Sequence, residues 1–230
     1  MIDNWSYTWV RRWNQCQLQF YFMKHAPEQL RIKDVMSDAA NAGIQDHETL
    51  ERLVNTRNPE ASLPEHLEGA RKWLRTLCAG DGPAPLAEVT YDLDERLKPV
   101  DSPRKNWRLI WLRLRIDAMR WNRSGTKAVV IDWKTGKSTD MDDLQLQLYP
   151  AILFQLYPDL EEVTTGYVFT RSGKDSFVRF HRDQAFELWE PFREFLEAKD
   201  AARQSSTYRH NPGFACKWCP AKQVCPAGER

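Results

Sequence analysis

The sequence predicts an α/β protein with a central mixed sheet flanked by helices. Four segments have compositions or apolar spacings suited to helices: residues 6–24, 34–55, 142–149 and 183–203. Five segments have the apolar character or alternation of strands: residues 87–93, 107–121, 129–134, 163–169 and 177–181. Because a helix separates the first three strands from the last two, we expect helices to cover the sheet.

Length and charge restrict the classes of protein only broadly. A chain of 230 residues is one large domain or one domain with appendages, and its formal net charge of +1 indicates no partner. No apolar run approaches the roughly 18 residues of a membrane span, and the polar start is not a signal peptide. We therefore expect a cytoplasmic protein without a membrane partner.

Basic residues gather in one region, between Ser102 and Ala128. This region has one acid, Asp117, against eight basic residues: Arg104, Lys105, Arg108, Arg113, Arg115, Arg120, Arg123 and Lys127. Such a distribution would attract a polyanion, although a solvated strand face is the alternative.

Two acids are expected to face each other across a hairpin. The turn signal at 122–126 joins two alternating runs, and with Ser124-Gly125 as its loop the register places Asp117 opposite Asp132. Facing like charges destabilise a strand pair, so a cation should lie between them, and Mg²⁺ or Mn²⁺ suits such carboxylates. Lys134 shares a face with Asp132. The alternative is an ordinary solvent-exposed pair of Asp132 and Lys134.

Three motifs carry a resemblance to a known family. Asp117 followed by Asp132-x-Lys134 resembles the core of the PD-(D/E)XK nuclease superfamily. Gln145-x3-Tyr149 on the following helix is similar to the motif of its RecB-like branch, and Gly43-x3-His47 resembles another element of that branch. The family's usual glycine before Arg-Ile-Asp is Leu114 here.

The resemblance implies a restriction-endonuclease-like core and a set of roles for named residues. The metal would be held by His47, Asp117, Asp132 and the backbone carbonyl of Trp133. The catalytic set would be Asp117, Asp132, Lys134, Gln145 and Tyr149. The basic hairpin would follow the DNA backbone, with Arg113, Arg115, Arg120 and Lys137 as expected contacts. His66 competes with His47, and Glu88 could reach the site or serve a structural role.

Four of the five cysteines form a second pattern. Cys216, Cys219 and Cys225 are one ligand short of a tetrathiolate site. A cysteine in the first helix, Cys16, together with this triplet resembles the [4Fe-4S] site of CRISPR-associated RecB-like exonucleases and AddB-type nucleases, although Gln17 replaces the usual proline. Zinc bound by three cysteines and His210 is the alternative for the tail. We expect Cys78 to lie in the core.

These observations predict one RecB-like nuclease domain over 1–230, with a helical part at 1–80, a catalytic core at 85–205 and a Cys-rich tail at 206–230. The expected activity is metal-dependent DNA hydrolysis, as an exonuclease on single strands or DNA ends in recombination, repair, phage DNA processing or CRISPR adaptation. The alternative is a non-catalytic DNA-binding or scaffold subunit. The sequence has no helicase motif, so a partner would supply unwinding.

Overall fold

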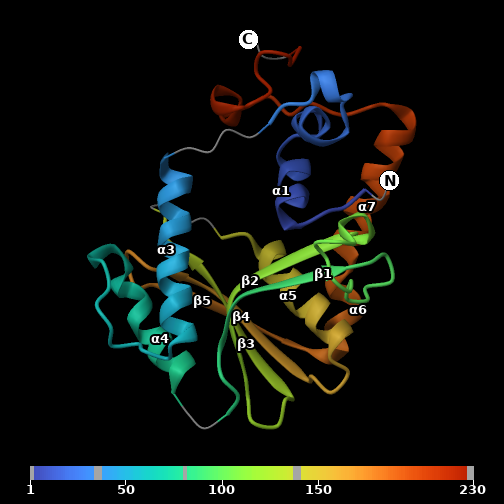
Figure 1. Ribbon diagram of the computed structural model, residues 1–230. Coiled ribbons are helices and arrows are strands. Elements are labelled where there is room, and N and C mark those ends of the chain that lie inside the picture. The colour runs from blue at the N-terminus through green and yellow to red at the C-terminus, as the bar shows by residue number, and fades with distance from the viewer. Residues whose placement is uncertain (1–2, 34–37, 80–81, 137–140, 227–230) are drawn as a thin grey trace. The chain divides into compact units, whose positions relative to one another are not determined.

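The computed structural model describes residues 3–33, 38–79, 82–136 and 141–226, and the chain divides into two compact units (Figure 1). We call Met1–Asn4 with Asp38–Trp189 the core unit, and Trp5–Ser37 with Glu190–Arg230 the terminal unit. The terminal unit therefore joins the two ends of the sequence. The division into parts at 1–80, 85–205 and 206–230 stays a prediction.

The core unit is built on a five-stranded sheet in the order β1-β2-β3-β4-β5. The strands are β1 Leu86–Leu93, β2 Leu112–Trp121, β3 Lys127–Lys134, β4 Glu162–Phe169 and β5 Asp175–His181. Only β3 and β4 pair in parallel, and the other neighbours are antiparallel. The predicted mixed sheet and α/β class are confirmed.

One face of the sheet packs against α3 (Asp38–Asn55) and α4 (Arg71–Cys78) (Figure 1). Their buried leucines, including Leu50 and Leu74, share a core with Ala118, Ile131 and Trp133. Alternation along β3 therefore directs Val130 and Asp132 to the opposite face. The sheet thus separates a hydrophobic layer from the side that carries Asp132.

Helix α5 (Asp143–Leu156) packs on β4 on that opposite side. The Thr165 hydroxyl donates to the Leu146 carbonyl at 3.1 Å, and the Tyr167 hydroxyl donates to the Asp142 carbonyl at 2.8 Å. Asp142 caps the helix by accepting from the Leu144 amide. The predicted cap, Asp140, lies outside the described residues. The helix continues through buried Pro150 to Leu156, seven residues beyond its predicted end at 149.

Two further predicted elements differ from the structure. Residues Trp107–Leu109 form a 3₁₀ turn, and β2 begins only at Leu112. The predicted helix over 183–203 divides at Trp189 into α6 (Ala185–Leu188) and α7 (Glu190–Ser205). Further 3₁₀ turns cover Glu65–Ala70 and Arg182–Gln184.

In the terminal unit, the predicted uninterrupted helix over 6–24 is wrong at Cys16. The backbone of Cys16 is extended, with φ −167° and ψ 113°, between α1 (Tyr7–Gln15) and α2 (Gln17–Phe20). A π-helical turn, Tyr21–His25, and a 3₁₀ turn, Glu28–Leu30, follow. The break lies where the tail is bound, since the Leu18 amide donates to the Arg209 carbonyl at 3.0 Å.

Aromatic side chains make the interior of the terminal unit. The ring of Trp13 lies edge-on to Phe20 and to Phe195 of α7, and Trp5 stacks on Phe192. The tail contains a 3₁₀ turn, Phe214–Trp218, that includes Cys216 and is followed directly by Cys219. Among the described residues, no helix combines the length and apolar character needed to cross a membrane.

Candidate functional site

The hairpin of β2 and β3 brings the two predicted acids to one place. Pairing of Met119 with Val130 and of Ala118 with Ile131 sets the register that the turn predicted, which places Asp117 opposite Asp132. The Asp117 carboxylate accepts a hydrogen bond of 2.8 Å from the Trp133 amide. Regular strand pairing therefore fixes the position of this carboxylate.

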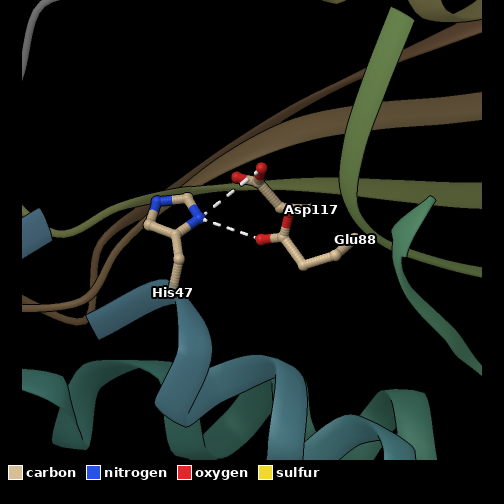
Figure 2. A group of neighbouring side chains, drawn as sticks. All are labelled: His47, Glu88 and Asp117. Atoms are coloured by element: carbon tan, nitrogen blue, oxygen red, sulfur yellow. Dashed lines mark hydrogen bonds and ion pairs between the residues drawn. The ribbon is translucent and has the colours of Figure 1, made fainter. Parts of the chain in front are cut away.

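Two further ligand-type side chains converge on Asp117. Figure 2 shows His47 of α3 pointing toward the carboxylates of Glu88 and Asp117. The His47 Nδ1 atom lies 3.4 Å from Glu88 Oε1 and 3.6 Å from Asp117 Oδ1. One ligand atom from each of the three lies within 4.8 Å of the others, and carboxylates with an imidazole suit Mn²⁺ or a related divalent cation. We call these three residues the acid–histidine cluster.

Glu88 reaches this cluster from a strained backbone. Its φ of +50° lies in the left-handed region, which is costly for a residue with a Cβ atom. The Arg115 guanidinium donates to the second oxygen of the same carboxylate. Glu88 is thus held between a cation on β2 and the imidazole of His47.

The pKa values of the cluster reflect burial and crowding of like charges. Burial, with the nearby Asp132 charge, raises the pKa of Asp117 to about 7, although His47 and the Trp133 amide oppose the rise. Burial lowers the pKa of His47, but its hydrogen bond to Glu88 and the charges of the carboxylates around it raise the value more. Burial raises the pKa of Glu88, yet His47 and Arg115 outweigh it and the net shift is downward. A bound cation would favour the deprotonated forms of these groups.

Asp132 lies beside this cluster with partners of its own. The Lys134 Nζ atom lies 2.6 Å from Asp132 Oδ2, and Asp132 Oδ1 accepts from the Tyr149 hydroxyl at 2.8 Å and from the Gln145 amide. Gln145 also donates to the Tyr149 hydroxyl at 3.2 Å, as residues four apart on one helix can. Burial, with the Asp132 and Asp117 charges, raises the pKa of Tyr149, so its hydroxyl remains a donor.

Four cysteines meet in the terminal unit. Cys16, Cys216, Cys219 and Cys225 line one cavity of about 220 Å³, together with His210 and Phe214. The Gly213 amide donates to the Cys216 sulfur at 3.4 Å. Burial raises the pKa of the Cys219 thiol, and the neighbouring thiols raise it further against the opposing effect of the Ala221 amide. Cys78 lies on α4 and is only partly buried, so the expectation that it belongs to the core is wrong.

The two kinds of metal site considered for these thiols need different sulfur spacings. A single zinc ion with Zn–S bonds of about 2.3 Å requires its sulfurs about 3.8 Å apart. An iron-sulfur cluster binds each thiolate on a different iron atom, which places the sulfurs farther apart.

A family model for the PD-(D/E)XK nuclease superfamily matches residues 4–226, almost the whole sequence. The chain belongs to the PD-(D/E)XK nuclease superfamily. The match covers both units, so membership of this nuclease superfamily applies to the terminal unit as well as to the sheet. No curated protein matches the sequence.

Two solved structures resemble this superfamily member in fold. A crystal structure from Eubacterium rectale with the name "Putative exonuclease" has a TM-score of 0.50 and 12% identity, and the match covers 99% of this chain and 87% of that one. The crystal structure of SSO0001 has a TM-score of 0.47 and 14% identity, with coverage of 98% and 87%. The first likeness supports the fold alone.

The residues expected to contact DNA in this PD-(D/E)XK protein have protein partners. Arg113 makes a bidentate pair with Asp92, and Arg115 binds Glu88. Arg120 instead donates to the Leu77 and Ala79 carbonyls at the C-terminal end of α4, where it stabilises the helix. Lys137 lies outside the described residues. His66, the competitor of His47, pairs with Asp46 at 2.7 Å.

Sequence reasoning missed one member of the site and left another undecided. Tyr167 pairs with Asp132 in the parallel register, its hydroxyl lies 3.1 Å from Gln145 Oε1, and Lys134 Nζ lies 4.5 Å from its ring centroid. The sequence placed Tyr167 in a strand, but it did not specify which strands lie next to that strand. Glu88, which the sequence left between two roles, lies in the acid–histidine cluster.

Proposed function

We propose that this nuclease-superfamily member is a metal-dependent deoxyribonuclease of the RecB-like branch, acting as an exonuclease on single strands or DNA ends. One observation carries the proposal. The acid–histidine cluster adjoins an ion pair of Asp132 and Lys134, which Gln145 and Tyr149 bind from α5. Carboxylates, a lysine and oriented donors in one place are the groups that phosphodiester hydrolysis needs.

The donor set fits a hard divalent cation. Asp117 and Glu88 supply partly buried carboxylate oxygens, His47 supplies a nitrogen, and Asp132 with the Trp133 carbonyl completes the expected ligand set. A Mg²⁺ or Mn²⁺ ion bound there would polarise the scissile phosphate and lower the pKa of a bound water. The raised pKa of Asp117 supports this assignment, because a cation removes the repulsion that holds the proton.

The neighbouring side chains have roles that follow from their contacts. Lys134 is partly exposed and would donate to a phosphate oxygen or to the attacking water, where it stabilises negative charge. Gln145 and Tyr149 donate to Asp132 and so orient that carboxylate as positioning residues. Tyr167 binds the other end of the Gln145 amide and fixes which way it points.

We also propose that Cys16, Cys216, Cys219 and Cys225 hold a [4Fe-4S] cluster. The shared cavity supports a metal site built from these four thiols, and the resemblance to iron-sulfur nucleases favours the cluster. His210 lines the same cavity, so zinc bound by three cysteines and a histidine is the alternative outcome. A bound cluster would join the start of the chain to its end, which removes conformational freedom from the unfolded state.

The nuclease proposal is tested with end-labelled single- and double-stranded DNA in Mg²⁺ or Mn²⁺. We expect wild-type protein to degrade DNA and Lys134→Ala to lose at least about 100-fold in rate, as for loss of one transition-state charge contact. Lys174→Ala, which removes an exposed lysine from the β4–β5 turn, is the matched control and should cleave normally. DNA binding without cleavage by the wild type would favour the non-catalytic scaffold subunit instead.

The cluster proposal is tested by anaerobic purification of Cys16→Ser and Cys78→Ser. We expect Cys16→Ser to lose the broad visible absorbance and the iron and sulfide that wild type contains, and Cys78→Ser to keep them. Zinc in the wild type, without iron, would support the alternative site. The cellular pathway follows from neither test. We propose an intracellular role in recombination, repair, phage DNA processing or CRISPR adaptation, with a helicase or another such protein as partner.

A further inference from the structure

The segments around the cysteine cavity have no acidic residue. From Trp5 to Pro27 and from Ala201 to Pro226 the chain has no Asp or Glu, and the last acid before the tail is Asp200. These segments hold seven basic residues: Arg11, Arg12, Lys24, Arg203, Arg209, Lys217 and Lys222. The whole chain has a net charge of only +1, so these segments are much more basic than the chain as a whole. Such a surface attracts polyanions.

Two large aromatic rings lie open to solvent on the same segment. Phe214 is 81% exposed and Trp218 is 61% exposed, the first being the most exposed large apolar side chain among the described residues. Their ring centroids are 4.6 Å apart at an interplanar angle of 72°, and Lys217 Nζ lies 5.1 Å from the Trp218 ring centroid. We call Phe214 and Trp218 the aromatic platform. Exposed rings beside a lysine match the composition of surfaces that bind unpaired bases.

We propose that the aromatic platform binds unpaired bases of single-stranded DNA, while the basic residues of the same unit bind its phosphates. The proposal rests on the proposed function in one respect, that DNA is the substrate. Charge favours nucleic acid over a protein partner, because Arg209, Lys217 and Lys222 are all exposed and residues 201–226 contain no Asp or Glu. Stacking decides between single and double strands, because the faces of paired bases are covered by their neighbours.

The contacts of the tail explain how the platform keeps its place. Asn211 donates to the Gln15 carbonyl at 3.2 Å, and the Arg209 amide donates to the Gln17 side chain at 3.1 Å. Cys219 and Ala221 pack with Phe22 and Ala26 in a small core. The two rings themselves contribute little to that core, so their removal should leave the tail folded.

The test measures binding of the full-length protein to fluorescein-labelled oligonucleotides in EDTA, where cleavage is absent. The ligands are a single strand of thymidines, an abasic strand of equal length and a blunt duplex. We expect Phe214→Ala and Trp218→Ala each to weaken binding to the thymidine strand about tenfold, the size of one lost stacking contact. Affinity for the abasic strand should stay unchanged. Phe186→Ala, which removes a 69% exposed ring from α6, is the matched control.

Two further variants separate stacking from charge and from folding. Trp218→Phe keeps a ring and should restore most of the affinity. Lys217→Ala with Lys222→Ala should weaken binding to all three ligands and reduce its salt dependence. Iron and sulfide content, or zinc content, should equal that of wild type in every variant.

The outcomes of the nuclease and binding tests are independent. Equal affinity of wild type and both alanine variants for the thymidine strand would overturn the aromatic platform, whether or not the protein cleaves DNA. A platform-dependent preference for the thymidine strand in a protein that cleaves nothing would keep this inference and reject the nuclease proposal. Equal losses on the abasic strand would also overturn it, because the rings would then not contact bases.

Discussion

Removal of the Asp117 charge should stabilise the metal-free protein. The Asp117 carboxylate is buried beside Asp132 and Glu88, and its pKa rises from 3.8 to about 7. A group whose pKa is raised on folding contributes stability below its unfolded pKa, and that contribution is lost as the pH rises through the folded pKa. Without metal, the wild-type site should therefore lose stability between about pH 4 and pH 7. Asp117→Asn cannot ionise and should not show this loss.

The magnitude follows from the size of that shift. A difference of about three pH units corresponds to about 4 kcal/mol for the fully ionised carboxylate. Rearrangement of the site and entry of water reduce this value. The asparagine oxygen can still accept a hydrogen bond from the Trp133 amide, so that contact is kept. We therefore expect the variant to gain about 2 kcal/mol in free energy of unfolding at pH 8. For a chain of this size that gain raises Tm by about 4–8 °C.

The assay is thermal unfolding of wild type and Asp117→Asn from pH 5 to pH 8, with EDTA and then with Mn²⁺. The difference between the two proteins isolates Asp117 from the other titrating groups. We expect the variant to be the more stable protein in EDTA at pH 8, with the advantage shrinking toward pH 5. With Mn²⁺ the wild type should gain stability and the variant much less. A variant that is less stable than wild type in EDTA at pH 8 would refute the argument from repulsion.

Two further changes test the cluster and the fold. Glu88→Gln should raise the Mn²⁺ concentration needed for half-maximal cleavage about 10–100-fold, with activity restored at high Mn²⁺, whereas an unchanged metal requirement would assign Glu88 to binding Arg115 alone. Gly69→Ala should destabilise the protein by more than about 2 kcal/mol in urea unfolding, because a Cβ atom there would lie 2.2 Å from the Thr170 carbonyl and 2.5 Å from the Gly173 nitrogen. Gly136→Ala, whose Cβ would meet nothing within 4 Å, is the control.

The parts of the site that the sequence predicted depend on local geometry. The connection between β2 and β3, residues 122–126, is longer than the predicted two-residue loop but keeps the same register, so the opposition of Asp117 and Asp132 follows from the sequence of the hairpin alone. The contact of Gln145 with Tyr149 follows from their spacing on one helix. Both relations involve short stretches of chain, in which backbone geometry leaves few alternatives.

The parts that the sequence did not predict depend on contacts between distant segments. Tyr167 joins the site only because β4 pairs in parallel with β3, and no local pattern specifies that pairing. The break at Cys16 lies in a segment with an uninterrupted helical pattern, and the tail residue Arg209 binds beside it. The sequence does not distinguish Arg120 from the other basic residues of the hairpin. In the structure its guanidinium donates to backbone carbonyls at the end of α4.

The structure assigns different environments to the two facing acids. Asp132 has a lysine, a tyrosine hydroxyl and an amide as partners, so its charge is compensated by the protein itself. Asp117 has one backbone amide and the imidazole of His47, and it lies near Glu88. Asp117 thus has fewer compensating partners than Asp132, which favours a cation on the side of His47 and Glu88, whereas the sequence had suggested a cation midway between the two aspartates. A cation bound among Asp117, Glu88 and His47 would leave Lys134 beside it on Asp132, free to exchange that carboxylate for a phosphate oxygen. Such an exchange would link metal binding to substrate binding. The cation would neutralise the carboxylates, and the phosphate would take over the ammonium group of Lys134 from Asp132.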